Sequence, residues 1–131
     1  MIALDTNVLV RIAVADDPGQ TAQAVRLLER ARASGERLFV PDIVLCELAW
    51  VLRASYGLDR AAIGTAIAAL TEVDELIFRD PDAVGDAIAA QARGDGGFAD
   101  HLIAATARAA GCEAVATFDQ ALQKLPGFVA V

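Results

Sequence analysis

The feature that most constrains this chain is a repeated change in the spacing of its apolar residues. Short apolar segments of three or four residues, typical of buried strands, alternate with longer segments whose apolar residues recur at helical spacing. No hairpin signal joins one short segment to the next, so consecutive strands must be connected by crossovers and run parallel. The predicted strands span residues 2–4, 38–40, 75–78, 114–116 and 128–130. This pattern predicts an α/β fold in which a parallel sheet carries helices on both faces.

The segments between the strands predict six helices. They span residues 6–15, 21–33, 41–55, 59–70, 81–93 and 98–110, and one helical turn is expected near residues 121–122. Thr6 is expected to cap the first helix, and Asp42 to cap the helix that begins at Pro41. The glycine-rich residues 94–97 are expected to form a flexible loop.

Size and composition predict one domain, residues 1–131, with a well-filled core. Hydrophobic residues make up 56% of the 131 residues, and a chain of this length normally builds a single core. No apolar run approaches the roughly 18 residues that span a bilayer, and the N-terminus lacks the basic and apolar regions of a signal peptide. The expected location is therefore the cytoplasm, where Cys46 and Cys112 would stay reduced.

Four acidic residues stand beside apolar segments. Asp5 follows the first predicted strand, and Asp119 follows the fourth. Glu47 interrupts one apolar helix, and Asp100 opens another. A carboxylate beside a core loses hydration and needs a cation or hydrogen bonds in return. The chain has one lysine, Lys124, and no arginine directly beside any of the four acids, so a bound divalent metal ion is the simplest remedy.

The strand order brings at least two of these acids to one edge of the sheet. Ligands of open α/β sheets bind outside the carboxyl ends of the strands, and Asp5 and Asp119 each lie just past a predicted strand. The helix that carries Glu47 leaves the second strand, so it starts at the same edge. The helix of Asp100 begins after a long loop, and right-handed crossovers allow but do not require its placement there.

A cluster of these acids would be a site for Mg²⁺ or Mn²⁺. Gathered carboxylates repel one another unless a cation lies between them. Oxygen ligands suit Mg²⁺ or Mn²⁺ better than Zn²⁺, which prefers His and Cys, and the chain has a single His. The net charge of -7 argues against a broad phosphate-binding surface. A metal ion held by acids can still receive a phosphate, and a few arginines can guide a nucleic-acid strand.

The four acids stand in four short motifs that run the full length of the chain. The motifs are Leu4-Asp5-Thr6-Asn7-Val8-Leu9, Glu47 six residues after Pro41, Asp100-x-x-Ile103-Ala104, and Ala116-Thr117-Phe118-Asp119. In this order and spacing they resemble the PIN-domain ribonucleases and, within these, the VapC-type toxins of toxin–antitoxin pairs. The resemblance implies a PIN-like three-layer α/β/α fold with a central parallel sheet of four to five strands.

The resemblance also implies a metal-dependent endoribonuclease. The implied catalytic residues are Asp5, Glu47, Asp100 and Asp119. All but Glu47 would bind Mg²⁺, with Mn²⁺ as the alternative, whereas Glu47 would bind a second metal ion or orient the attacking water. Thr117 and Asn7 would hold the carboxylates through hydrogen bonds. Metal ions at such a site lower the pKa of bound water and stabilise charge on a phosphodiester.

Two other readings of these residues remain open at this point. Haloacid-dehalogenase-type phosphohydrolases also place an Asp after the first strand, but they need a second Asp two residues later, where this chain has Asn7. A module that keeps the fold, binds a partner and does not catalyse would use the acids for metal-based stability only.

The resemblance names the partners as well. It implies RNA as the substrate, a VapB-type antitoxin protein as the inhibitor, and a homodimer. An antitoxin segment would lie in an apolar groove, for which residues 8–14 and 63–70 offer apolar helix faces. No membrane association is expected.

Overall fold

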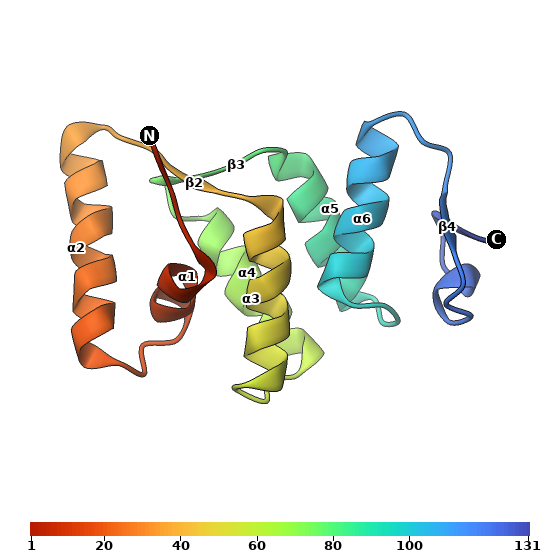
Figure 1. The fold of residues 1–131 in the computed structure, drawn as a ribbon, viewed down its shortest axis with the longest axis horizontal. Helices are drawn as coiled ribbons and strands as arrows, with labels where there is room; N and C mark the ends of the chain where they lie inside the picture. The colour runs from red at the N-terminus through yellow and green to blue at the C-terminus, as the bar shows by residue number, and fades with distance from the viewer. The chain divides into compact units, whose positions relative to one another are not determined.

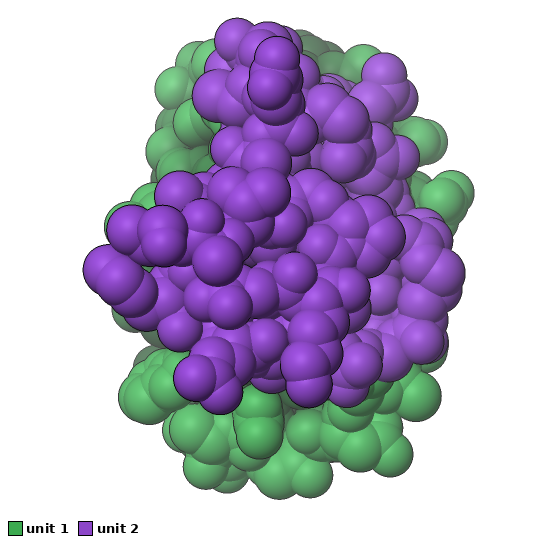
Figure 2. Space-filling view, turned by 90° about the vertical axis from the view of Figure 1, so that its right-hand side faces the viewer, with its two compact units in different colours: residues 1–79 green, residues 80–131 purple.

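The computed structural model describes all residues, 1–131, and they form two compact units. Unit 1 comprises Met1–Arg79 and unit 2 comprises Asp80–Val131 (Figures 1 and 2). Each unit has its own parallel sheet and its own buried apolar residues. None of the helices is both long enough and apolar enough to cross a membrane.

Unit 1 is built around a parallel three-stranded sheet in the order β1–β2–β3. Its strands are β1 (Ile2–Ala3), β2 (Leu38–Val40) and β3 (Leu76–Phe78). The register pairs Ile2 with Leu38 and Leu38 with Leu76. The Leu4 amide donates to the Phe39 carbonyl at 2.8 Å, which extends the β1–β2 pairing by one residue. Because the strands are parallel, the residues that follow all three lie at one edge of this sheet.

Two helices fill each crossover of unit 1. These helices are α1 (Thr6–Ala13), α2 (Pro18–Ser34), α3 (Asp42–Ala54) and α4 (Arg60–Thr71). α1 packs on α2, α3 and α4, and α3 also packs on α4. The fully buried side chains of unit 1 with the largest volumes are Leu9, Leu38, Leu45, Leu48, Leu52, Ile67 and Val40. The apolar face of α4 is used in this core, since Ile63, Ile67 and Leu70 are all buried.

Two helix starts in unit 1 differ from the sequence prediction. The N-cap of α1 is Asp5, whose side chain accepts from the Thr6 amide, so the prediction that Thr6 caps this helix is wrong by one residue. The N-cap of α3 is Pro41, and Asp42 is the first helical residue. Asp42 instead pairs with Arg79 at 2.7 Å and so ties the end of β2 to the end of β3.

Unit 2 is smaller and consists of two packed helices and a two-stranded sheet. The helices are α5 (Pro81–Ala92) and α6 (Phe98–Ala109), which pack on each other (Figure 1). β4 (Val115–Thr117) and β5 (Phe128–Ala130) pair in parallel, and the short 3₁₀ helix η1 (Leu122–Lys124) lies between them in the chain. The buried apolar residues of this unit are Ala83, Val84, Ala87, Phe98, Leu102, Ala105, Leu122 and Phe128.

The structure confirms the α/β class and the parallel pairing of the strands. All five predicted strands are present, each two or three residues long. They are divided between a three-stranded and a two-stranded sheet. The six predicted helices are also found, and α2 begins three residues earlier than predicted because Asp17 caps it, with Pro18 in its first turn.

Candidate active site

Asp5 lies at the carboxyl end of β1, where the topology of a parallel sheet places ligands. Its backbone is extended, and its Oδ1 accepts a hydrogen bond from the Thr6 amide at 2.8 Å. The preceding residue, Leu4, is buried and paired with β2, so it fixes the point at which the chain leaves the sheet. Asp5 is therefore an exposed carboxylate held by a buried neighbour and by the first turn of α1.

Glu47 is joined to this edge by Thr6. The Thr6 hydroxyl donates to Glu47 Oε2 at 2.6 Å, a link between α1 and α3 across 41 residues of sequence. Thr6 is buried, whereas Glu47 is exposed on α3. The hydroxyl thus fixes one oxygen of the carboxylate and leaves Oε1 for water or a ligand. Asp5 and Glu47 therefore both bond to Thr6, Asp5 to its amide and Glu47 to its hydroxyl.

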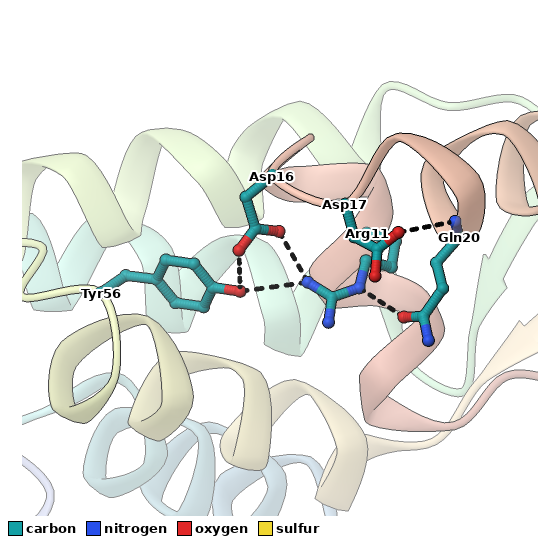
Figure 3. A network of polar contacts seen from close by, with 5 residues as sticks. All are labelled: Arg11, Asp16, Asp17, Gln20 and Tyr56. Carbon is teal, nitrogen blue, oxygen red and sulfur yellow. Dashed lines mark hydrogen bonds and ion pairs between the residues drawn. The ribbon is translucent and has the colours of Figure 1, made fainter.

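A polar network fixes the other end of α1. Arg11 donates to Asp16 Oδ1 at 2.6 Å, to the Tyr56 hydroxyl at 3.2 Å and to Gln20 Oε1 at 2.7 Å (Figure 3). Tyr56 in turn donates to Asp16 Oδ2 at 2.9 Å. The hydrogen bond from Tyr56 and the charge of Arg11 lower the pKa of Asp16, whereas the hydrogen bond of Arg11 to Tyr56 and the charge of Asp16 raise the pKa of Arg11. α1, which begins with Thr6, is therefore tied to α2 and to the end of α3.

In unit 2, Asp119 lies two residues after the end of β4 and organises the next turn. Its Oδ1 accepts from the amides of Ala121 and Leu122 at 2.9 and 3.2 Å. Its own amide donates to the Thr117 hydroxyl at 3.0 Å, and Gln123 donates to the Thr117 carbonyl at 2.9 Å. Thr117 therefore holds the backbone of Asp119, and the turn leaves the carboxylate exposed.

Asp100 lies in the first turn of α6, as the sequence predicts. Its Oδ2 accepts from the Gly97 amide at 2.9 Å, which closes the turn that leads into the helix. The side chain is half-buried. Like Asp5 and Asp119, Asp100 accepts from the backbone through one carboxylate oxygen.

The chemistry of these donors fits a hard cation. Each of the four carboxylates accepts its hydrogen bonds from the protein through one oxygen, and oxygen-only donors suit Mg²⁺ or Mn²⁺. Burial is not what makes a cation necessary, because three of the acids are exposed and Asp100 is half-buried. The acids occur as two pairs, one in each unit, and no group of three His, Cys, Asp or Glu side chains gathers within either unit. The four-acid metal site stays a prediction.

One residue of this arrangement escaped the sequence reasoning. Thr6 makes the hydrogen bond to Glu47. Asn7 lines a pocket between α1 and α2, and its expected hydrogen bond to a carboxylate stays a prediction. A threonine at the first helical position is common, so sequence alone gave no signal for its role. The partner of its hydroxyl is fixed only when α1 packs on α3.

Two of the four acids, Asp5 and Asp119, lie just past strands of parallel sheets, and the other two lie on helices. The family profile of the PIN domain matches residues 2–127, so the chain belongs to the PIN domain family. A search of curated proteins gives no match. Among solved structures, the chain is similar to VapC20 of Mycobacterium tuberculosis, described as a toxin that cleaves the sarcin–ricin loop. The two share 23% identity over 86% of this chain and 85% of that one, with a TM-score of 0.40.

Proposed function

We propose that this PIN-domain protein is a metal-dependent endoribonuclease and acts as the toxin of a toxin–antitoxin pair. The observation that carries the proposal is the Asp5–Thr6–Glu47 arrangement at the carboxyl edge of the sheet in a chain of the PIN family. The buried Thr6 hydroxyl uses its only proton for a hydrogen bond to the Glu47 carboxylate. A buried polar group is thus satisfied by one of the proposed catalytic residues. A purely structural helix start would need the Asp5 cap alone.

Asp5, Asp100 and Asp119 would hold Mg²⁺ or Mn²⁺ through the oxygens that their backbone contacts leave free. A metal ion bound there would supply charge stabilisation on the phosphate and a lower pKa for the attacking water. The backbone hydrogen bonds keep the carboxylates in position before a metal ion binds, because each is fixed by its own helix start or turn.

Glu47 would act on the attacking water. In the proposed step the water oxygen bonds to phosphorus, its proton passes to Glu47, and the bond from phosphorus to the leaving oxygen breaks. The leaving oxygen takes a proton from solvent. Thr6 would hold Glu47 Oε2, so that Oε1 faces the water.

The test compares two aspartates with the same local structural role. Asp5 caps α1 and Asp59 caps α4, each through one backbone amide at 2.8 Å. The wild-type protein should cleave RNA with Mg²⁺ or Mn²⁺ and not with EDTA. Asp5→Asn should lose more than the roughly 10–100-fold that outer-shell groups contribute, whereas Asp59→Asn should cleave like the wild type. Equal activity of Asp5→Asn and the wild type would sink the proposed site.

The family resemblance also supports the other parts of the proposal. A VapB-type antitoxin would inhibit the protein, which would act on RNA as a homodimer in the cytoplasm. Tight metal binding without RNA cleavage would favour the non-catalytic alternative. Membership of the PIN family leaves no support for the dehalogenase-type alternative. Co-expression with the product of a neighbouring short reading frame, followed by size-exclusion chromatography, tests the antitoxin; separate elution contradicts it.

A further inference from the structure

Unit 2 contains a pocket that the proposed chemistry does not use. Its volume is about 350 Å³, and α5, α6, the loop before α6 and the segment before β5 line it. Four alanines of α5 and α6 line the pocket together with five charged or titratable residues, Asp86, Arg93, Asp95, His101 and Arg108. Pockets of roughly 300 Å³ and more that combine apolar walls with convergent polar groups are the usual sites for small ligands.

The lining carries three groups suited to a nucleotide. Arg93 closes α5, and Arg108 lies in the last turn of α6. Arg108 pairs with Asp86 at 3.3 Å, but both side chains are more than 60% exposed, so the pair is weak and most donors of the guanidinium stay available. The third group is His101, which follows the predicted metal ligand Asp100 directly.

The structure holds the His101 ring in place. Its Nε2 lies 2.8 Å from the Asp95 carbonyl, and since a carbonyl only accepts, Nε2 carries a proton. Gly96 passes so close that an added Cβ would lie 2.9 Å from Nε2, and its φ of +83° also favours glycine. A fixed aromatic ring on a pocket wall is a platform on which a base can stack at little entropic cost.

Two aspartates in the lining limit which ligands fit the pocket. Asp86 and Asp95 would repel a bare phosphate, so the pocket fits a ligand that brings N–H donors together with its anionic group. A nucleotide with an exocyclic amine meets this condition, because a carboxylate accepts from such an amine.

We propose that this pocket binds one nucleotide of the RNA substrate beside the bond that is cleaved, with its base on His101 and its phosphate at Arg93 and Arg108. The proposal rests on the proposed function, because the pocket residue His101 directly follows Asp100, a predicted metal ligand at the start of α6. In a chain of net charge -7, two arginines on one pocket would supply a local phosphate contact that the surface as a whole does not.

The experiment measures binding without cleavage. Fluorescence anisotropy follows a labelled octacytidine with Asp5→Asn protein in Mg²⁺. The double variant Arg93→Gln/Arg108→Gln is compared with Arg26→Gln/Arg53→Gln, which removes two exposed arginines from unit 1. The pocket variant should bind roughly tenfold more weakly for each lost contact. Its slope of log affinity against log salt should fall by roughly 0.7 per contact, while the control keeps its slope.

A third variant removes no charge. Ala89→Phe fills the pocket from an exposed position of α5 and should also weaken binding. Circular dichroism and thermal unfolding confirm that each variant is folded. Octacytidine should bind more tightly than octauridine, which lacks the exocyclic amine; equal affinities overturn the role of the carboxylates.

The two proposals fail in different ways. If the pocket and control variants lose affinity equally, the pocket proposal is overturned, while cleavage by wild type that is lost in Asp5→Asn still supports the nuclease. If binding depends on Arg93 and Arg108 but the wild-type protein cleaves nothing, the pocket stands as a nucleotide site and the proposed function fails.

Discussion

Unit 1 fixes one of its two acids, Glu47, by a long-range contact, whereas unit 2 fixes both of its acids locally. In unit 1, Glu47 is held by Thr6 across 41 residues of sequence, and Arg32–Glu75 and Arg11–Tyr56 join elements 43 and 45 residues apart. In unit 2, Asp100 bonds an amide three residues away, and Asp119 bonds amides two and three residues away. The acids of unit 2 are therefore set by local turn and helix-start geometry, whereas Glu47 depends on how two helices pack.

Because of this difference, the positions of the carboxylates are sensitive to different changes in the protein. A locally fixed carboxylate keeps its position as long as its own turn folds. A carboxylate fixed from another element moves when either helix shifts, so changes far from it in sequence alter its orientation. Function and stability should follow this division.

The largest expected effect tests whether both units contribute to one reaction. Asp119→Asn and Asp100→Asn should each reduce RNA cleavage as much as Asp5→Asn, because each removes a proposed metal ligand. Asp80→Asn is the control in unit 2, since Asp80 caps α5 through the Ala83 amide at 3.0 Å. Full activity of Asp119→Asn would restrict the active site to unit 1.

A smaller effect is expected from the two threonines. Thr6→Val removes the hydrogen bond to Glu47 and should lower kcat by roughly 10–100-fold, as outer-shell groups do. Thr6→Ser keeps the hydroxyl and should restore most of the rate. Thr117→Val removes an acceptor for one backbone amide and should cost less. A larger loss for Thr117→Val than for Thr6→Val contradicts the division between long-range and local fixation.

Lowering the pH should reduce the stability of unit 1. The hydrogen bond from Arg32 lowers the pKa of the buried Glu75 below its usual 4.5, and the one from Tyr56 lowers the pKa of Asp16 below 3.8. The folded state therefore binds these protons less readily than the unfolded state. The stabilisation is complete above pH 4.5 and is lost as pH falls through the folded pKa values. Hydrogen exchange at pH 6 and pH 3 should show the loss, and Glu75→Gln should reduce the difference.

The smallest effect should be equal in the two units. Asp59 caps α4 and Asp80 caps α5 in the same way, through one amide of the first turn. Replacement of either by Ala should lower the free energy of unfolding by about 1 kcal/mol. Urea unfolding of the two variants measures this. A cost several times larger at one position would show that its aspartate does more than cap a helix.

The sequence predicted the elements well because their signals are local. Apolar period, proline, glycine and capping residues lie within a few positions of each helix end, and strand 38–40 was placed at its observed bounds. The placement of Asp5 and Asp119 after their strands followed from the same signals. The one-residue error at Thr6 arose because Asp5 and Thr6 are both good caps.

Other features could not be predicted because they depend on packing. The link from Thr6 to Glu47 needs the α1–α3 contact, and the ion pair of Asp42 with Arg79 needs the register of β2 and β3. Apolar flanks suggested that Glu47 is shielded from water, yet it lies on the exposed side of α3. The single domain of residues 1–131 stays a prediction beside the two compact units.

The hydrogen bond from Thr6 to Glu47 can form only after both residues have been synthesised. A ribosome adds about 5–20 residues per second, so the 41 residues between the two partners take at least roughly 2–8 s to make. During that time Asp5 and Thr6 can already start α1, but Glu47 does not yet exist. An incomplete chain that ends before α3 therefore has the first acid of the proposed nuclease without the carboxylate that would take the proton.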